Sequence, residues 1–224
     1  EAAERLLAHL PSDDPRIAEA VAILLEHLDN NVGRVVGLVS SMLARREAWL
    51  PVLPASIDDY GQAGEARLAL EAARAAIVQD HLAGLAEAFP PGLLAEACVY
   101  AQGAAQVLRQ EGKESPILAC GPGVPGADIN DVAHWQGLAE FLLTGKGDPR
   151  KSFTVAVGVR AQDKKRPELA ALKVRIQSVA DEFARYEELF EPLHATRALP
   201  PREYQDAEWT VLKSLLLVLR LAAA

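Results

Sequence analysis

The sequence has few of the features that mark a disulfide-stapled, secreted or membrane-spanning protein. Only two cysteines, Cys98 and Cys120, occur among 224 residues, and no secretory leader pattern is present. A disulfide scaffold is excluded because a chain of this length can bury a sufficient core without staples. The most apolar stretch, residues 215–224, contains Arg220 and falls well short of the ~20 residues that cross a bilayer. We predict a soluble, cytoplasmic protein with no membrane partner.

Aromatic residues are also scarce, at 5% of the chain, whereas alanine and leucine number 40 and 32. Alanine and leucine favour helices, while strands prefer β-branched and aromatic residues. The composition therefore predicts an all-α protein. Glu1 already lies in a helical pattern and Met42 is the only methionine, so we expect a piece of a longer polypeptide.

Apolar residues at three-and-four spacing, with prolines and glycines between the runs, divide the chain into helices. The predicted helices are residues 1–10, 16–28, 32–50, 65–89, 93–110, 131–145, 169–190 and a last one from about residue 203. Short breaks favour antiparallel neighbours. We predict an irregular multi-helix bundle with one long loop at 115–130 and a short extended or β-like basic arm at 145–166. It forms a single helical domain, 1–224, with a possible division into 1–114 and 131–224.

Two of these helices have distinctive apolar patterns. Between Leu169 and Phe190 the apolar residues step by three and four alternately, which is typical of coiled-coil-like packing. In the last helix apolar residues occupy most of the helix circumference. We therefore expect other elements to pack on several of its faces, and we infer that one neighbouring element is missing from this sequence. The run Phe153–Val157 is interpreted as a short strand or an extended arm.

No motif in the sequence indicates a catalytic, cofactor or metal site. The spacing of Gly121, Gly123 and Gly126 matches a dinucleotide-binding turn, but the intervening prolines lack the N–H groups that such a turn uses. Neither Gly-Lys pair, at residues 112–113 and 145–146, is followed by the Ser or Thr of a phosphate loop. The five histidines are spread along the chain without metal-ligand spacing. We predict no catalytic, metal or cofactor-binding residues.

The charge distribution is the most informative feature. Nine basic and three acidic residues lie between Lys146 and Arg175, which gives 9 − 3 = +6 in a chain of net charge −8. An acidic body with one basic segment is expected where a polyanion is bound locally. The alternative is that residues 164–166 merely solvate a helix start, where positive charge is unfavourable. The candidate nucleic-acid-binding residues are Lys146, Arg150, Lys151, Arg160, Lys164, Lys165 and Arg166.

Two stretches carry a family resemblance. His27-Leu-Asp-Asn-Asn31, followed by residues 42–50 (MLARREAWL), is similar to a segment of bacterial helicase–nuclease subunits of the RecB and AddA type. Leu199-Pro-Pro-Arg-Glu-Tyr204, followed by Trp209, Leu212 and Leu216, resembles the helix that in those proteins precedes the strand bearing the Mg²⁺-holding carboxylates. The pattern of these RecB and AddA proteins is also matched by Trp135, by residues 142–144 and by the basic residues that follow.

The resemblance implies the helical subdomain called 1B, inserted into the first motor lobe of a superfamily 1 helicase. Such a subdomain contacts DNA and packs on the motor lobes of the same polypeptide. It implies a role in double-strand break repair and recombination. The parent protein would be an ATP-dependent 3′–5′ DNA helicase with possible exonuclease activity, and it would pair with a second subunit of a helicase–nuclease complex. ATP and Mg²⁺ are expected for that parent, with their residues outside this segment.

Two alternatives remain open. The chain could be a helical protein-interaction domain that docks a partner through residues 215–221 and has no role with nucleic acid. It could also be a small helical enzyme that uses buried carboxylates and a metal ion.

Overall fold

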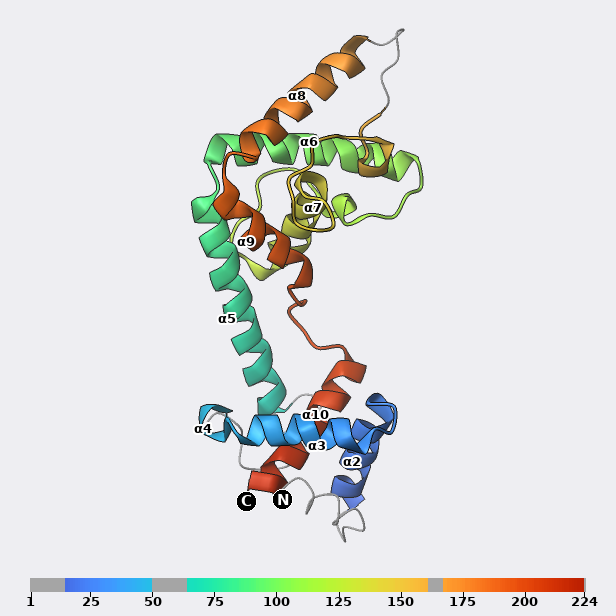
Figure 1. Ribbon diagram of the computed structural model, residues 1–224, viewed down its shortest axis with the longest axis vertical. Coiled ribbons are helices and arrows are strands. Elements are labelled where there is room, and N and C mark those ends of the chain that lie inside the picture. The colour runs from blue at the N-terminus through green and yellow to red at the C-terminus, as the bar shows by residue number, and fades with distance from the viewer. Residues whose placement is uncertain (1–14, 50–63, 161–166, 224) are drawn as a thin grey trace. The chain divides into compact units, whose positions relative to one another are not determined.

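The computed structural model describes residues 15–49, 64–160 and 167–223, and in these residues the chain is all-α (Figure 1). No β-strand occurs in these ranges, and the one β-type pairing there is an isolated antiparallel bridge between Leu143 and Pro149. The predicted fold class is confirmed. The helix expected at residues 1–10 lies outside the described residues.

The chain forms two compact units, residues 1–73 with 203–224 (unit 1) and residues 74–202 (unit 2). The division suggested between residues 114 and 131 falls inside unit 2. The boundary falls within α5 (Glu65–Ala88). The other helices of unit 1 are α2 (Pro15–His27), α3 (Val32–Leu43), α4 (Arg46–Trp49) and α10 (Asp206–Ala223). Those of unit 2 are α6 (Pro91–Gln110), α7 (Val132–Leu142), α8 (Pro167–Phe183) and α9 (Phe190–Ala195), with 3₁₀ turns at Pro116–Ala119, Ile129–Asp131, Val155–Val157, Glu187–Leu189 and Thr196–Ala198.

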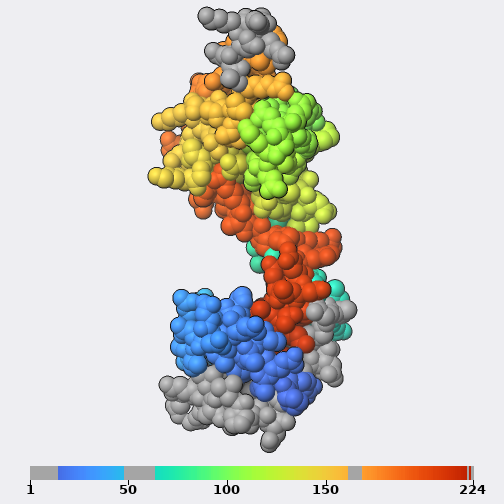
Figure 2. Space-filling view, turned by 90° about the vertical axis from the view of Figure 1, so that its right-hand side faces the viewer, coloured from blue at the N-terminus to red at the C-terminus, as the bar shows by residue number. Residues whose placement is uncertain are grey.

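Unit 1 is built around α10, which packs against α2 and α3. Figure 2 shows these N-terminal helices, in blue, beside α10, in red. Leu216, Leu217, Val218 and Leu219 of α10 are buried in one core with Leu24 and Val39. The cover predicted for this apolar helix is therefore supplied, for these four residues, from within the unit.

A polar cluster joins the start of α10 to the start of α5. Arg67 donates to the Glu71 carboxylate at 2.9 Å and to Asp206 at 3.2 Å, and its guanidinium lies 5.9 Å from the ring centre of Trp209. The backbone N–H of Tyr204 also donates to Glu71. The cluster thus orients the fully buried Trp209 in the unit 1 core.

The turn between α2 and α3 has an unusual backbone. Asp29 and Asn30 both adopt positive φ, at 55° and 56°. Aspartate and asparagine tolerate this left-handed region better than other non-glycine residues. Asn31 then caps α3, its side chain accepting from the Arg34 N–H at 3.0 Å. The residues of the 27–31 resemblance therefore have a local structural role.

Unit 2 is organised by aromatic side chains from several elements. Phe89 lies 5.8 Å from Phe183 and 6.2 Å from Trp135 between ring centres. The Trp135 indole donates to the Gly126 carbonyl at 2.8 Å, which anchors the long loop at 115–130. Gly137 of α7 faces this loop so closely that a Cβ there would lie 2.6 Å from the Cys120 sulfur.

The helix predicted over 169–190 is wrong in its second half. α8 ends at Phe183, and a turn leads to α9, which begins at Phe190. The two phenylalanine rings lie 5.3 Å apart. The apolar spacing continues across the break because both segments bury their side chains in the same core. A strand at 153–157 is also not formed, because Thr154 caps a 3₁₀ turn and Gly158 follows in the left-handed region at φ 75°.

Candidate nucleic-acid interface

Residues 143–150 form a small hairpin after α7, which we call the Lys146 hairpin. The Thr144 N–H donates to the Asp148 carbonyl at 2.7 Å, and the Arg150 N–H donates to the Leu142 carbonyl at 2.8 Å. The Gly147 N–H donates to the Thr144 carbonyl at 3.1 Å, which closes the turn. Lys146 lies in this turn and is exposed. Figure 2 shows the segment that follows the hairpin, in yellow, on the surface beside α6, in green.

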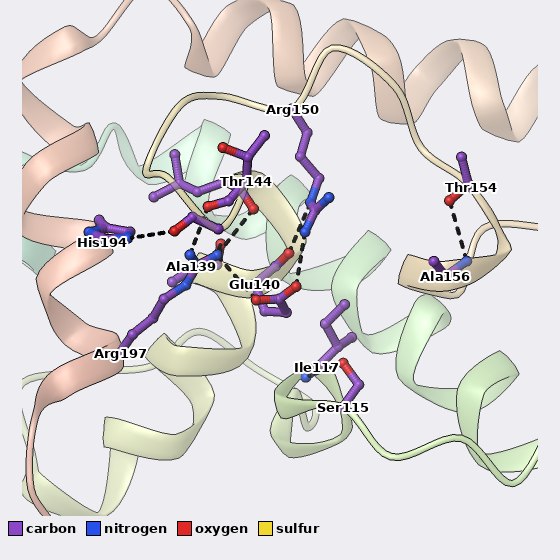
Figure 3. A network of polar contacts seen from close by, with 12 residues as sticks. Ser115, Ile117, Ala139, Glu140, Thr144, Arg150, Thr154, Ala156, His194 and Arg197 are labelled. Carbon is purple, nitrogen blue, oxygen red and sulfur yellow. Dashed lines mark hydrogen bonds and ion pairs between the residues drawn. The ribbon is translucent and has the colours of Figure 1, made fainter.

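Arg197 anchors the base of the hairpin (Figure 3). One guanidinium nitrogen donates to the Thr144 carbonyl at 2.7 Å, and another donates to the carbonyls of Ala139 and Leu143 at 2.9 and 3.1 Å. The Ala139 and Leu143 carbonyls lie at the end of α7, where the helix runs out of backbone donors, and Thr144 follows directly. A cation there also complements the helix dipole. Arg197 therefore ties α7, the hairpin and the segment after α9 together.

Arg150, a predicted nucleic-acid-binding residue, belongs to the same network. Its side chain donates to the Glu140 carbonyl at 3.1 Å and to the Glu140 carboxylate at 2.9 Å. Burial lowers the pKa of Arg150, and the neighbouring Glu140 carboxylate acts in the opposite direction. Glu140 also forms an ion pair with Arg197, at 3.2 Å. Two of the three guanidinium nitrogens of Arg150 are thus used within the fold, which leaves it fewer donors for a ligand than the exposed lysines have.

His194 of α9 packs against the turn of the Lys146 hairpin. Its ring lies against Gly147, where a Cβ would come within 3.2 Å of the imidazole, and φ is +89°. Glycine satisfies both demands, since it lacks the Cβ and adopts positive φ without strain. The imidazole Nε2 also lies 3.4 Å from the Gly145 carbonyl. The tip of the hairpin is thus held from the side of α9.

The remaining predicted residues fall into three groups. Lys151 is exposed directly after the hairpin. Arg160 is half-buried and donates to the Gln110 side chain at 2.6 Å. Lys164, Lys165 and Arg166 lie outside the described residues. Exposed Lys146 and Lys151 therefore share one anchored segment, and with Arg150 and Asp148 the segment has a net charge of 3 − 1 = +2.

Sequence reasoning did not identify Glu140 or Arg197 as part of this site. Arg197 contacts residues 53 to 58 positions earlier in the chain, and no local pattern signals such a pairing. The only available sign was the strongly basic segment itself, which directed attention to Arg150 and not to the residues that hold it.

Other candidates for chemistry are structural. In the described ranges, no three side chains of His, Cys, Asp or Glu are grouped to hold a metal ion. Both cysteines are buried thiols, and burial raises the pKa of Cys98 to about 11 and of Cys120 to about 12. Thiols with pKa values this high are poor nucleophiles at neutral pH.

Comparisons of the chain with models of known families, with curated proteins and with solved structures gave no match. As for membranes, none of the described helices is, by itself, both long and apolar enough to cross a bilayer. The bent pair of α5 and α6 meets that test jointly, by length and composition only.

Proposed function

We propose that this chain is a DNA-contacting accessory module without catalytic residues of its own, part of a superfamily 1 ATP-dependent DNA helicase or exonuclease. It would act in double-strand break processing. Its contribution would be mechanical and electrostatic, because a helical body presents cations to the phosphate backbone while motor lobes elsewhere in the polypeptide translocate. ATP and Mg²⁺ would bind to those lobes.

The observation that carries the proposal is the placement of Lys146 and Lys151 on an anchored surface segment. Both lysines are exposed, whereas the arginines nearby are used inside the fold. A backbone that is already ordered loses less entropy when the lysines it carries contact a phosphate. The sequence continues this basic segment to Arg175, for a total of +6.

Two further points support the same reading. The resemblance of residues 27–50 and 199–216 to RecB and AddA proteins predicts such a module. The absence of phosphate-loop and carboxylate motifs from the sequence is what that placement requires, since ATP and metal would be bound elsewhere.

The test is binding of the chain to fluorescent forked DNA over a range of salt concentrations. We compare the wild type with Lys146→Glu/Lys151→Glu and with Lys164→Glu/Lys165→Glu/Arg166→Glu. Each set should weaken binding by about tenfold or more at low salt and flatten the dependence of log K on log salt, because fewer counterions are released.

A matched control is Arg45→Glu/Arg46→Glu in unit 1, two exposed arginines whose replacement makes the same change in net charge as the lysine pair. This control should bind nearly as the wild type does. Equal losses in the control and the test variants would indicate a general charge effect and overturn the assignment. Unchanged binding in both test variants would do so as well.

The alternative function, docking of a partner protein through residues 215–221, would have little exposed apolar surface to use. Leu216 to Leu219 are buried against α2 and α3, so these four side chains are already covered within unit 1.

A further inference from the structure

A groove of about 330 Å³ lies between α6 and the first half of α8 in unit 2. α8 runs at an angle to α6, so the two helices diverge (Figure 1). Its floor includes the buried residues Ala104, Gly158, Val159 and Ile176. The volume lies within the range of about 300–1,000 Å³ in which protein pockets hold ligands.

The groove walls are mostly aliphatic. Six of the lining residues are Val99, Val107, Val159, Leu169, Leu172 and Ile176. Two of them, on opposite helices, remain open to solvent: Val99 is 63% exposed and Leu172 is 42% exposed. Large apolar side chains exposed on both sides of one groove indicate a surface that buries them in a complex.

The charge around the groove selects the partner. Among the described residues that line it, Arg160 is the only one with a charged side chain, and Gln106 and Gln110 lie on the same side of α6. In the sequence, the stretch from Arg160 to Arg175 carries six basic and two acidic residues, or 6 − 2 = +4. An occupant must therefore be apolar along one face and acidic beside it.

We infer that this groove between α6 and α8 is a docking site for an acidic amphipathic helix of a partner protein. A helix places apolar side chains at positions i, i+3, i+4 and i+7 along one stripe, which is the shape that two diverging helices accept. A glutamate or aspartate next to that stripe reaches Arg160. A nucleobase fits less well, because stacking needs flat aromatic partners and Tyr100 is the one aromatic residue in the described lining.

The experiment is a selection from displayed helical peptides, with the whole chain as target. Apolar residues are varied along one stripe, and Glu or Lys is allowed at the flanking positions. Selected peptides should carry Glu in preference to Lys and bind the purified chain. Val99→Asp and Leu172→Asp should each weaken this binding by about tenfold or more, and Arg160→Glu should reverse the preference from Glu to Lys.

Val174→Asp is the matched control. Val174 lies on α8 and is 66% exposed, but it does not line the groove, so this variant should bind the selected peptides as the wild type does. Thermal unfolding followed by circular dichroism establishes that each variant is folded. A Val99→Cys variant provides a second measurement, because bound peptide should protect this thiol from alkylation while the buried native cysteines react slowly.

The inference does not depend on the proposed function, and the outcomes separate the two. Failure to enrich any peptide would overturn the docking site, as would peptides that bind Leu172→Asp normally or show no preference between Glu and Lys. Single-stranded oligonucleotide that binds the wild type but not Leu172→Asp, in the absence of peptide binding, would assign the groove to nucleic acid and also overturn it. Salt-sensitive DNA binding unaffected by Leu172→Asp leaves both conclusions standing.

Discussion

Gly158 lies against the backbone of Ala104 in α6. A Cβ at Gly158 would come within 2.8 Å of the Ala104 Cα and carbonyl carbon, and still closer to the carbonyl oxygen. The backbone of Gly158 is also left-handed, at φ 75°. This glycine therefore sets how closely the segment after the 3₁₀ turn at Val155–Val157 packs on α6.

Gly158→Ala should lower the free energy of unfolding by about 2–4 kcal/mol, because alanine adds both backbone strain and a clash that requires α6 to shift. Chemical denaturation measures the change. The control is Gly84→Ala near the C-terminal end of α5, where a Cβ meets nothing within 4 Å. That substitution should raise the free energy of unfolding by about 0.5–1 kcal/mol. Equal effects at the two positions would contradict the packing described for Gly158.

Arg197→Met should release the Lys146 hairpin from α7. It removes donors from the carbonyls of Ala139, Leu143 and Thr144 and leaves Glu140 with one arginine. We expect the free energy of unfolding to fall by about 2–4 kcal/mol, since Arg197 is largely buried and its partners lose charged donors. Hydrogen exchange should show faster exchange at the Gly147 and Arg150 amides.

Arg185→Met serves as the comparison for Arg197, since Arg185 is exposed just after α8. Its effect should stay within about 0.5 kcal/mol, as for most surface changes. Unaltered exchange in the hairpin of Arg197→Met would show that Arg197 does not hold it.

The buried cysteines predict a loss of stability in alkali. Their pKa values lie above the ordinary value of 9.0 in the folded protein, at about 11 for Cys98. Between these values the folded state keeps the thiol proton while the unfolded state releases it, so raising the pH favours unfolding. The contribution is fully present below pH 9 and is lost as the pH rises towards 11.

Comparison of the wild type with Cys98→Ala isolates this effect. The free energy of unfolding of the wild type should fall from pH 9 to pH 11 by on the order of 2 kcal/mol more than that of the variant. Parallel pH profiles for the two proteins would mean that Cys98 is not held as a protonated thiol in the core.

Substitutions at neighbouring positions in the turn between α2 and α3 should have different effects on the free energy of unfolding. Asn30→Gly should leave stability unchanged or raise it slightly, because glycine adopts the observed φ of 56° more readily. Asn30→Val should cost about 1–2 kcal/mol in the same measurement. Asn31→Ala should cost about 1 kcal/mol, since it removes the cap on the Arg34 N–H. A destabilising Asn30→Gly would argue against the left-handed turn.

Local patterns predicted most helices well. Prolines, glycines and capping residues start or end a helix within a few positions of themselves. The first residues of α2, α6 and α7 therefore lie close to the predicted ones. The same patterns failed at Phe183, because apolar spacing reports that residues are buried and not that the helix is continuous. Phe183 and Phe190 share one core across a turn, and their spacing alone cannot distinguish this from a single helix.

The candidate site, too, was predicted only in the part that depends on local sequence. Charge counting identified the basic segment, because net charge is a sum that needs no fold. It could not tell Lys146 from Arg150, since that depends on Glu140 and Arg197, and Arg197 is about fifty residues away along the chain. Nor could it find the groove between α6 and α8, whose walls come from segments separated by about sixty residues.

Helical character, the absence of catalytic motifs and the basic stretch from residue 146 to residue 175 were thus readable from residue order, because each arises from composition or from neighbours within a few positions. Which cations face solvent, where the helices break and which apolar side chains stay open were decided by tertiary packing. These depend on contacts between distant residues, and the free energy of burying a side chain is set by whatever the fold brings against it.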